Sequence, residues 1–350
     1  MLFSKKKEII GVDIGSSSVK LVQMKANVDN YTLLNVGIAP LPSGAIVDNS
    51  LMDTTSIVET IKTLVKSLGI KTTDIVSSIS GNSVIVRKIT LPAMTPEELE
   101  DQIFWEAEQY IPYDINDVNI DFQILHSDLV DSAKMTVLLV ASKKDFINEY
   151  VSVFNEAGMK LVVVDVDSFA MQNCFELNYD SEKDNVVALI NIGASTVNVN
   201  IVKGGISLFT RDVQIGGNVY TEEIQRQFAI SSEESEKIKI TGECADASKF
   251  QEVMDRVNES ISAEILRSLD LYYTTADEQK VAKIFISGGC AKIPMLPSVL
   301  SKKSNMPVEI LNPFLKVEYN EKVFDPEYIQ QIGPFVSVAT GLAMRRLGDK

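Results

Sequence analysis

One short pattern occurs twice in this 350-residue chain. The first copy, near the start, reads EIIGVDIGSSSVKLVQM, and the second, more than half the chain later, reads VALINIGASTVNVNIV. Each copy has an apolar strand, a turn with one glycine and small hydroxyl residues, and a return strand. The separation is far longer than the roughly 20 to 50 residues typical of solenoid repeats, so the pattern predicts two similar domains.

The composition of the repeated turn suits a phosphate group. Glycine lets the backbone approach an anion, successive amides can point at one oxygen cluster, and hydroxyl groups add neutral donors. Asp13 ends the first strand and can hold a hydrated Mg²⁺ ion, which needs few carboxylates. A single turn of this kind is more typical of a plain hairpin, whereas two copies facing each other favour a polyphosphate. The candidate ligands are Gly15, Ser16, Ser17, Ser18 and Lys20 in the first copy and Asn191, Gly193, Ala194, Ser195 and Thr196 in the second.

Two glycine pairs and one charged pair extend this hypothesis. Gly216 and Gly217 precede a predicted helix, where free amides favour an anion; an ordinary strand-to-helix turn is an equal alternative. Gly288 and Gly289 follow the predicted strand 281–286 and would let a base and ribose approach the backbone. Glu236 and Lys239 lie one helical turn apart, a spacing that more often means a solvated ion pair. The sequence lacks GxxxxGK[ST] and GxGxxG, which excludes P-loop and Rossmann sites.

Composition narrows the function classes. The length favours two domains or one bilobed body. A net charge of −15 argues against nonspecific nucleic-acid or anionic-membrane binding. The three cysteines show no CxxC spacing, which suits a reducing compartment. No apolar run approaches the roughly 18 to 20 residues that span a bilayer, so we expect a cytoplasmic protein without direct membrane insertion.

Residues 84–160 read as a compact inserted α+β module. The stretch Thr95-Pro96-Glu97-Glu98 supplies a helix N-cap, a first-turn proline and a reciprocal glutamate. On the helix predicted over 95–110, one face carries Leu99, Ile103, Ala107 and Tyr110, with Trp105 off that stripe. We interpret Trp105, Tyr110 and Tyr113 as core and elbow residues of this helix.

The order of these motifs resembles the actin/Hsp70/sugar-kinase superfamily over essentially the whole chain. Asp13-x-Gly15-Ser16 with Lys20 resembles its first phosphate motif, Asn191-x-Gly193 with Thr196 its second, and Ile286-Ser287-Gly288-Gly289 its adenosine motif. Gly216 and Gly217 resemble the pair at the terminal phosphates, and Glu236 with Lys239 the pair beside adenine and ribose. The stretch PFVSVATGLAMRR resembles the second connecting helix.

Within the superfamily, the module at 84–160 resembles subdomain 1C of the cell-division protein FtsA. The closer resemblance is to the type IV pilus assembly protein PilM family, through LPAMTPEELEDQIFWEAEQYIPYDINDVNIDFQIL and the final GLAMRR. An FtsA is expected to continue into an amphipathic membrane-targeting helix, whereas this sequence stops at residues 348–350.

The resemblance implies an α/β, actin-like fold: a duplicated ribonuclease H-like, two-domain ATPase with an inserted 1C subdomain. The implied division is subdomain 1A at 1–83 and 161–185, subdomain 1C at 84–160, subdomain 2A at 186–220 and 281–332, subdomain 2B at 221–280, and a C-terminal helix at 333–350 that returns to 1A.

The implied ligands are ATP and Mg²⁺, and the implied partners are the cytoplasmic N-terminal peptide of the inner-membrane protein PilN and the pilus motor ATPases. This places the protein at the inner face of the inner membrane, attached through its partner, with ring or filament self-association. The second phosphate motif carries Asn191 where a carboxylate usually organises metal and water. We therefore expect slow ATP turnover at best, with Asp167 as the candidate to position a water and Asp165 as a weaker substitute.

Two alternatives stay open at this point. One is a filament-forming cytoskeletal ATPase related to FtsA and MreB. The other is a phosphotransferase such as a sugar kinase, which the sequence disfavours because it offers no cleft carboxylate placed to deprotonate a sugar hydroxyl.

Overall fold

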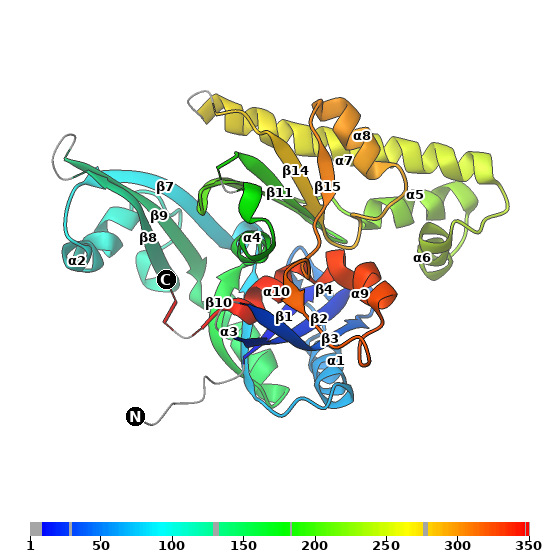
Figure 1. Ribbon diagram of the computed structural model, residues 1–350, viewed down its shortest axis with the longest axis horizontal. Helices are drawn as coiled ribbons and strands as arrows, with labels where there is room; N and C mark the ends of the chain where they lie inside the picture. The colour runs from blue at the N-terminus through cyan, green and yellow to red at the C-terminus, as the bar shows by residue number, and fades with distance from the viewer. Residues whose placement is uncertain are drawn as a thin grey trace.

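The computed structural model describes residues 9–27, 30–128, 133–182, 184–275, 279–346 and 348–349. Within these residues the chain forms two large helix-covered sheets and a smaller sheet that projects to one side (Figure 1). We call the six-stranded sheet with its helices the first lobe and the five-stranded sheet with its helices the second lobe. The three-stranded sheet with its helix is the side module.

The first lobe has the strand order β10-β6-β1-β2-β3-β16. The first three strands form the predicted antiparallel meander, and β6 and β10 lie parallel beside β1. Helices α1 and α3 pack on one face of β1, and α4 and α10 pack on the other. The bounds are β1 (Ile10–Gly15), β2 (Ser18–Ala26), β3 (Tyr31–Pro40), β6 (Asp74–Ile79), β10 (Lys160–Val166), β16 (Val317–Glu318), α1 (Thr54–Ser67), α3 (Lys144–Glu156), α4 (Asp167–Asn178) and α10 (Ser337–Met344).

Short elements connect these parts of the first lobe. Strands β4 (Ile46–Val47) and β5 (Ser50–Leu51) form a small hairpin, and the 3₁₀ turn η1 (Gly81–Ser83) leads into the side module. The turn η3 (Asp180–Glu182) follows α4, and α9 (Pro326–Ile332) and η4 (Gly333–Val336) precede α10.

Helix α10 is held close to its neighbours by two glycines. A Cβ on Gly11 of β1 would overlap the Ala339 carbonyl oxygen, and a Cβ on Gly341 of α10 would overlap the Ala170 carbonyl oxygen in α4. Because neither glycine has a Cβ, α10 can pack between β1 and α4 with its backbone in contact with both. Helix α10 is thereby built into the first lobe.

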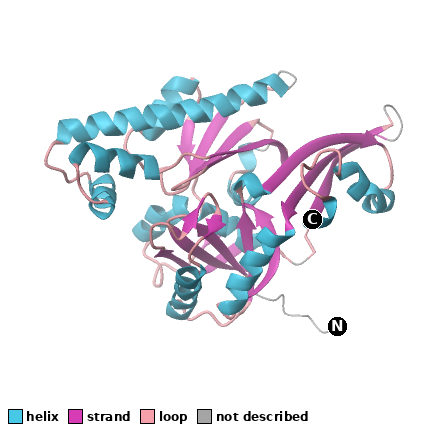
Figure 2. Ribbon diagram, turned by 180° about the vertical axis from the view of Figure 1, so that it is seen from behind, coloured by secondary structure: helices cyan, strands magenta, loops and turns pink. Residues whose placement is uncertain are grey.

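The second lobe repeats the plan of the first. Its strand order is β13-β12-β11-β14-β15, in which β11, β12 and β13 form an antiparallel meander and β14 runs parallel beside β11. The long helix α7 runs along the outer side of this lobe (Figure 2). The bounds are β11 (Val187–Ile192), β12 (Val197–Lys203), β13 (Ile206–Val213), β14 (Lys283–Ser287), β15 (Val308–Ile310), α5 (Asn218–Phe228), α6 (Ser232–Thr241), α7 (Ala247–Thr275) and α8 (Leu296–Ser304).

The side module comprises β7 (Val84–Pro92), α2 (Pro96–Ala107), η2 (Ile115–Asp117), β8 (Val118–Asp128) and β9 (Lys134–Lys143). Its strand order is β7-β9-β8, and it has its own apolar core. The predicted capping box forms, because Thr95 accepts from the Glu98 amide and Glu98 accepts from the Thr95 amide. The module is therefore a separately packed body attached to the first lobe.

One interpretation of this helix is wrong. Leu99, Ile103 and Ala107 are buried as predicted, but Tyr110 is exposed and Trp105 has 76% of its surface exposed. Helix α2 ends at Ala107, so its buried stripe stops before Tyr110, and Trp105 faces solvent because it lies off that stripe. Tyr113 is half-buried and packs against the module core, as expected of an elbow residue.

Candidate functional site

The first repeated turn joins β1 to β2. Asp13 and Lys20 are opposite each other across these strands, and Lys20 Nζ lies 3.2 Å from Asp13 Oδ2. The strand ladder ends at the Gly15–Ser18 pair, so the amides of Ser16 and Ser17 lie outside it. A Cβ on Gly15 would come 2.5 Å from Lys20 Nζ. Glycine at this position therefore lets the ammonium group lie over the turn, beside the carboxylate.

The second repeated turn joins β11 to β12 with the same geometry. Asn191 and Asn198 occupy the positions of Asp13 and Lys20, and Asn191 Nδ2 donates to Asn198 Oδ1 over 3.0 Å. The Gly193 amide donates to the Thr196 carbonyl, which leaves the amides of Ala194 and Ser195 outside the ladder. The ion pair of the first lobe is thus replaced by a pair of neutral amides in the second.

Gly216 and Gly217 lie against the second turn. The amides of Gly217 and Asn218 donate to the carbonyl groups of Gly193 and Ala194 over 2.9 and 2.8 Å. A Cβ on Gly216 would come 2.6 Å from both of those carbonyl oxygens. The expectation of a free amide is therefore wrong for Gly217, because the protein uses the amides of Gly217 and Asn218 to position the second repeated turn.

Glu236 and Lys239 lie on α6 and are tied to the start of α5. Lys239 Nζ contacts Glu236 Oε2 at 2.6 Å and also donates to the Thr221 hydroxyl and the Gly217 carbonyl. Only 10% of the Lys239 side chain is exposed but 46% of the Glu236 side chain is, so the ion pair is half-buried and is not the fully solvated pair considered from sequence. Thr221 in turn donates to Glu236 over 2.6 Å, which connects α6 to the glycine pair.

Gly288 and Gly289 follow β14 and reach the same place. Gly288 has φ of +89°, and a Cβ there would overlap the Ile192 carbonyl oxygen and come 2.6 Å from Asn191 Oδ1. Gly289 is exposed and lies in ordinary contact with the Phe335 ring. Burial raises the pKa of the next residue, Cys290, to about 11, so this thiol is neutral. The glycines of the second lobe thus converge on the end of β11.

Asp167 begins α4 beside the first turn. Its Oδ1 accepts from the Ser78 hydroxyl over 2.6 Å. Burial, together with the charge of Asp13, raises the pKa of Asp167 to about 6, while hydrogen bonds from Ser78 and Ser80 oppose the rise. Asp165 faces elsewhere and lies 3.1 Å from the Arg345 guanidinium. Strand β10 ends at Val166 and helix α4 begins at Asp167. The alternation of the strand therefore does not continue to Asp167, and the two carboxylates point in different directions.

Sequence reasoning missed Asp212, near the end of β13. Its Oδ1 accepts from Asn198 Nδ2 over 2.8 Å, and its Oδ2 accepts from the Gly81 amide of the first lobe over 2.6 Å. Burial raises the pKa of Asp212, and these two hydrogen bonds oppose the rise. Only the register of β12 against β13, which pairs Asn198 with Asp212, brings this carboxylate into the site.

Comparisons with known proteins support one family. The family model described as "Type IV pilus assembly protein PilM" matches residues 11–347. The chain belongs to the PilM family. A solved PilM–PilN type IV pilus biogenesis complex contains a chain that is 28% identical, with a TM-score of 0.88 and coverage of 97% of this chain and 98% of that one.

More distant relatives agree on the fold. The Bacillus subtilis cell-division protein FtsA is 24% identical over 66% of this chain, and the match spans only 57% of that protein. Spiroplasma citri MreB5, solved with ADP, is 13% identical, with a TM-score of 0.51 over 93% of this chain and 98% of that one. The PilM-family chain therefore has the actin-like ATPase fold that the resemblance implies.

The side chains and amides at the two repeated turns of this PilM-family chain fit a nucleotide that binds as a complex with a metal ion. In the described part of the chain, no group of three or more His, Cys, Asp or Glu side chains is placed to hold a metal ion. Mg²⁺ does not need such a cage, since it keeps most of its waters and binds one or two carboxylates together with substrate phosphates. Asp13 offers one carboxylate for such a cation, and Lys20 lies beside it. The amides of the two repeated turns, which lie outside the strand ladders, can donate to phosphate oxygens.

A separate groove of about 250 Å³ lies where the side module meets both lobes. Strands β7, β10 and β13, each at the edge of its own sheet, contribute to the wall. Edge strands have unpaired backbone groups that can pair with an added strand. The lining residues are Gly81, Asn82, Val84, Ile85, Val86, Arg87, Val166, Ser168, Thr210, Arg211 and Asp212.

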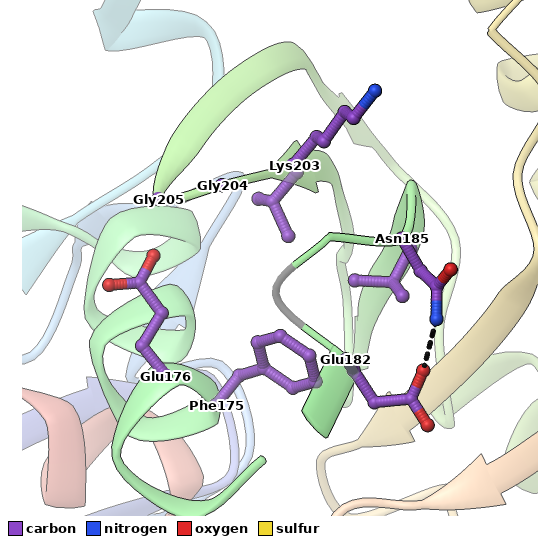
Figure 3. A pocket seen from close by; sticks show the side chains of 9 residues that line it. Phe175, Glu176, Glu182, Asn185, Lys203, Gly204 and Gly205 are labelled. Carbon is purple, nitrogen blue, oxygen red and sulfur yellow. Dashed lines mark hydrogen bonds between the residues drawn. The ribbon is translucent and has the colours of Figure 1, made fainter. Parts of the chain in front are cut away.

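A second hollow, between α4 and the far end of the second sheet, is too small for a ligand (Figure 3). Its volume is about 10 Å³, enough for a water molecule only. Asn185 donates to Glu182 at its rim, over 3.0 Å. None of the described helices is long and apolar enough to cross a membrane.

Proposed function

We propose that this protein is an ATP-binding adaptor of type IV pilus assembly that captures a short peptide of a PilN-like inner-membrane protein. The observation that carries the proposal is the likeness to a chain solved in a PilM–PilN complex, which extends over 97% of this chain. That coverage includes the side module as well as both lobes. In this proposal the protein lies at the cytoplasmic face of the inner membrane through its partner and connects that partner to the pilus motor ATPases.

Asp13 would hold the Mg²⁺ that accompanies ATP, and Lys20 would contact phosphate oxygens. The amides and hydroxyl groups of the two turns would surround the phosphates from opposite sides. Gly288 and Gly289 would lie beside the nucleoside, and Glu236 with Lys239 would support the start of α5. The bound cation would neutralise phosphate charge. Asp167 is ionised above a pH of about 6 and can orient a water, but Asn191 provides no second negative charge, so turnover is slow.

We place the peptide in the groove between the side module and the lobes. An extended segment could add to the edge of β7, with backbone hydrogen bonds for affinity and side-chain pockets for selectivity. The apolar wall of Val84, Val86 and Val166 favours aliphatic side chains, and Arg87 and Arg211 favour a carboxylate or amide. The predicted occupant is therefore a short extended peptide with alternating aliphatic and polar residues.

The test is fluorescence anisotropy with a labelled peptide from the cytoplasmic N-terminus of the PilN-like partner. We expect binding in the presence of Mg²⁺ and ATP, and a loss of at least about tenfold in affinity for Arg87→Glu. Arg267→Glu, an exposed arginine substitution on α7, is the matched control and should bind normally. Absence of peptide binding to the ATP-loaded protein would overturn the proposal. An equal loss of peptide affinity in both variants would show that the peptide does not bind in this groove.

A further inference from the structure

Three polar side chains lie in a row across the second sheet. Asn191 of β11 is paired with Asn198 of β12, and Asn198 is paired with Asp212 of β13. Residues directly opposite each other in a sheet point to the same face. Asn191 Nδ2 donates to Asn198 Oδ1 over 3.0 Å, and Asn198 Nδ2 donates to Asp212 Oδ1 over 2.8 Å. We call these three residues the amide relay.

The carboxylate fixes the direction of the whole relay. Both Asp212 oxygens accept hydrogen bonds, Oδ1 from Asn198 Nδ2 and Oδ2 from the Gly81 amide, so Asn198 presents its amide nitrogen to Asp212. Its carbonyl oxygen then faces Asn191, which must donate in turn. The remaining atom, Asn191 Oδ1, points toward the end of β14. A Cβ on Gly288 would lie 2.6 Å from this oxygen. Asp212 thus determines that Asn191 presents an acceptor, the atom a hydrated cation requires, beside Gly288 at the end of β14.

The second carboxylate oxygen connects the relay to the other lobe. Asp212 Oδ2 accepts from the Gly81 amide over 2.6 Å. Gly81 begins the turn η1 that leads directly into β7, and both Gly81 and Asp212 line the groove at the side module. One side chain therefore touches the groove wall and sets the amide direction at the candidate phosphate site.

We propose that Asp212 is a positioning residue that couples occupancy of the groove to the orientation of Asn191 at the nucleotide site. This inference rests on the proposed function, since it assigns the regulation of the same two sites. A peptide that holds η1 and β7 in place keeps the Gly81–Asp212 hydrogen bond, which holds the Asp212 carboxylate within reach of Asn198. When that carboxylate moves away from Asn198, the direction of the Asn198 and Asn191 amides is no longer fixed. By linkage, the nucleotide then changes peptide affinity by the same factor as the peptide changes nucleotide affinity.

The key variant is Asp212→Asn in the full chain. An asparagine that still accepts from Gly81 turns its nitrogen toward Asn198, which must flip, and Asn191 then presents a donor to the phosphate site. We expect ATP affinity without Mg²⁺ to stay within about twofold of the wild-type value. The increase in ATP affinity caused by Mg²⁺ should fall several-fold, and the coupling factor between Mg²⁺–ATP and the peptide should approach one.

A polarity-reversed double variant tests the mechanism directly. When Asn191→Asp is combined with Asp212→Asn, the new carboxylate on β11 would accept from the amide nitrogen of Asn198. The Asn198 oxygen would then accept from the new amide on β13, whose own oxygen would accept from the Gly81 amide. Every partner of the relay is satisfied again, with the carboxylate now at the phosphate site. We expect the double variant to recover the Mg²⁺ dependence that Asp212→Asn loses. Asn191→Asp alone should fold less well, because Asn198 Oδ1 then faces a carboxylate.

The readouts are isothermal titration of ATP with and without Mg²⁺, and peptide anisotropy with and without Mg²⁺–ATP. Asp101→Asn, on the exposed face of α2, is the control and should behave as wild type. A wild-type coupling factor of one, or full coupling in Asp212→Asn, would overturn the inference. If the wild-type protein binds no peptide, the proposed function fails, while the magnesium dependence in the single and double variants still decides whether Asp212 orients Asn191.

Discussion

The two lobes differ at one residue near the end of their first strand. In the first lobe Asp13 pairs with Lys20, so charge is present on both strands of the turn. In the second lobe Asn191 pairs with Asn198, and the nearest carboxylate of the relay, Asp212, lies one strand further away. An amide oxygen can accept from a metal-bound water but cannot supply the field of a negative charge. Under the proposed function, these residues would favour retention of ATP over its rapid hydrolysis.

Asp167 is expected to destabilise the protein when no ligand is bound. Its pKa is raised to about 6, so the folded protein favours the neutral form and loses stability as pH rises from about 4 through 6. Asp167→Asn removes that penalty and can still accept from Ser78. We expect a gain of about 1–3 kcal/mol in the free energy of unfolding at pH 8 and little gain near pH 4. Urea unfolding without nucleotide at both values checks this, and a gain that does not depend on pH would contradict it.

At the scale of elements, the sequence predicts what depends on local chemistry. The repeated hairpins and the capped helix α2 follow from strand alternation and cap residues. The position of the C-terminal helix is implied only by the family resemblance. Long-range packing decides the rest. The Gly217 amide is used by the second turn, Asp212 enters through the register of β13, and Tyr110 is exposed because α2 ends before it, at Ala107.

The contact between α10 and α4 predicts a sharp response to one methyl group. In Gly341→Ala the new Cβ overlaps the Ala170 carbonyl oxygen, which is backbone and cannot move away cheaply. We expect a loss of at least about 2 kcal/mol in the free energy of unfolding. Gly289→Ala, where the nearest atom is 3.5 Å away, should change stability by less than about 0.5 kcal/mol. Chemical denaturation of both variants compares them, and equal stabilities would mean that α10 packs less closely than described.

At the scale of the whole molecule, few polar contacts cross between the lobes near the candidate nucleotide site. Thr196 of the second turn donates to Asn49 of the β4–β5 hairpin over 3.4 Å, and Gly81 donates to Asp212. A ligand held by both repeated turns can therefore bias the lobes toward a closed arrangement by its differential affinity for that arrangement. The division into subdomains at residues 84, 161, 186, 221, 281 and 333 stays a prediction.

Closure predicts that Mg²⁺–ATP acts on both lobes together. At a ligand concentration 100-fold above Kd, binding to the folded state alone stabilises it by about 2.7 kcal/mol. We expect hydrogen exchange to slow in both repeated turns and in η1, and the radius of gyration measured by small-angle X-ray scattering to decrease. Asp13→Ala should lose both effects when Mg²⁺–ATP is held at the concentration that saturates wild type, because the cation loses its carboxylate while the fold remains. Protection confined to one lobe would show that the two turns do not bind the same ligand.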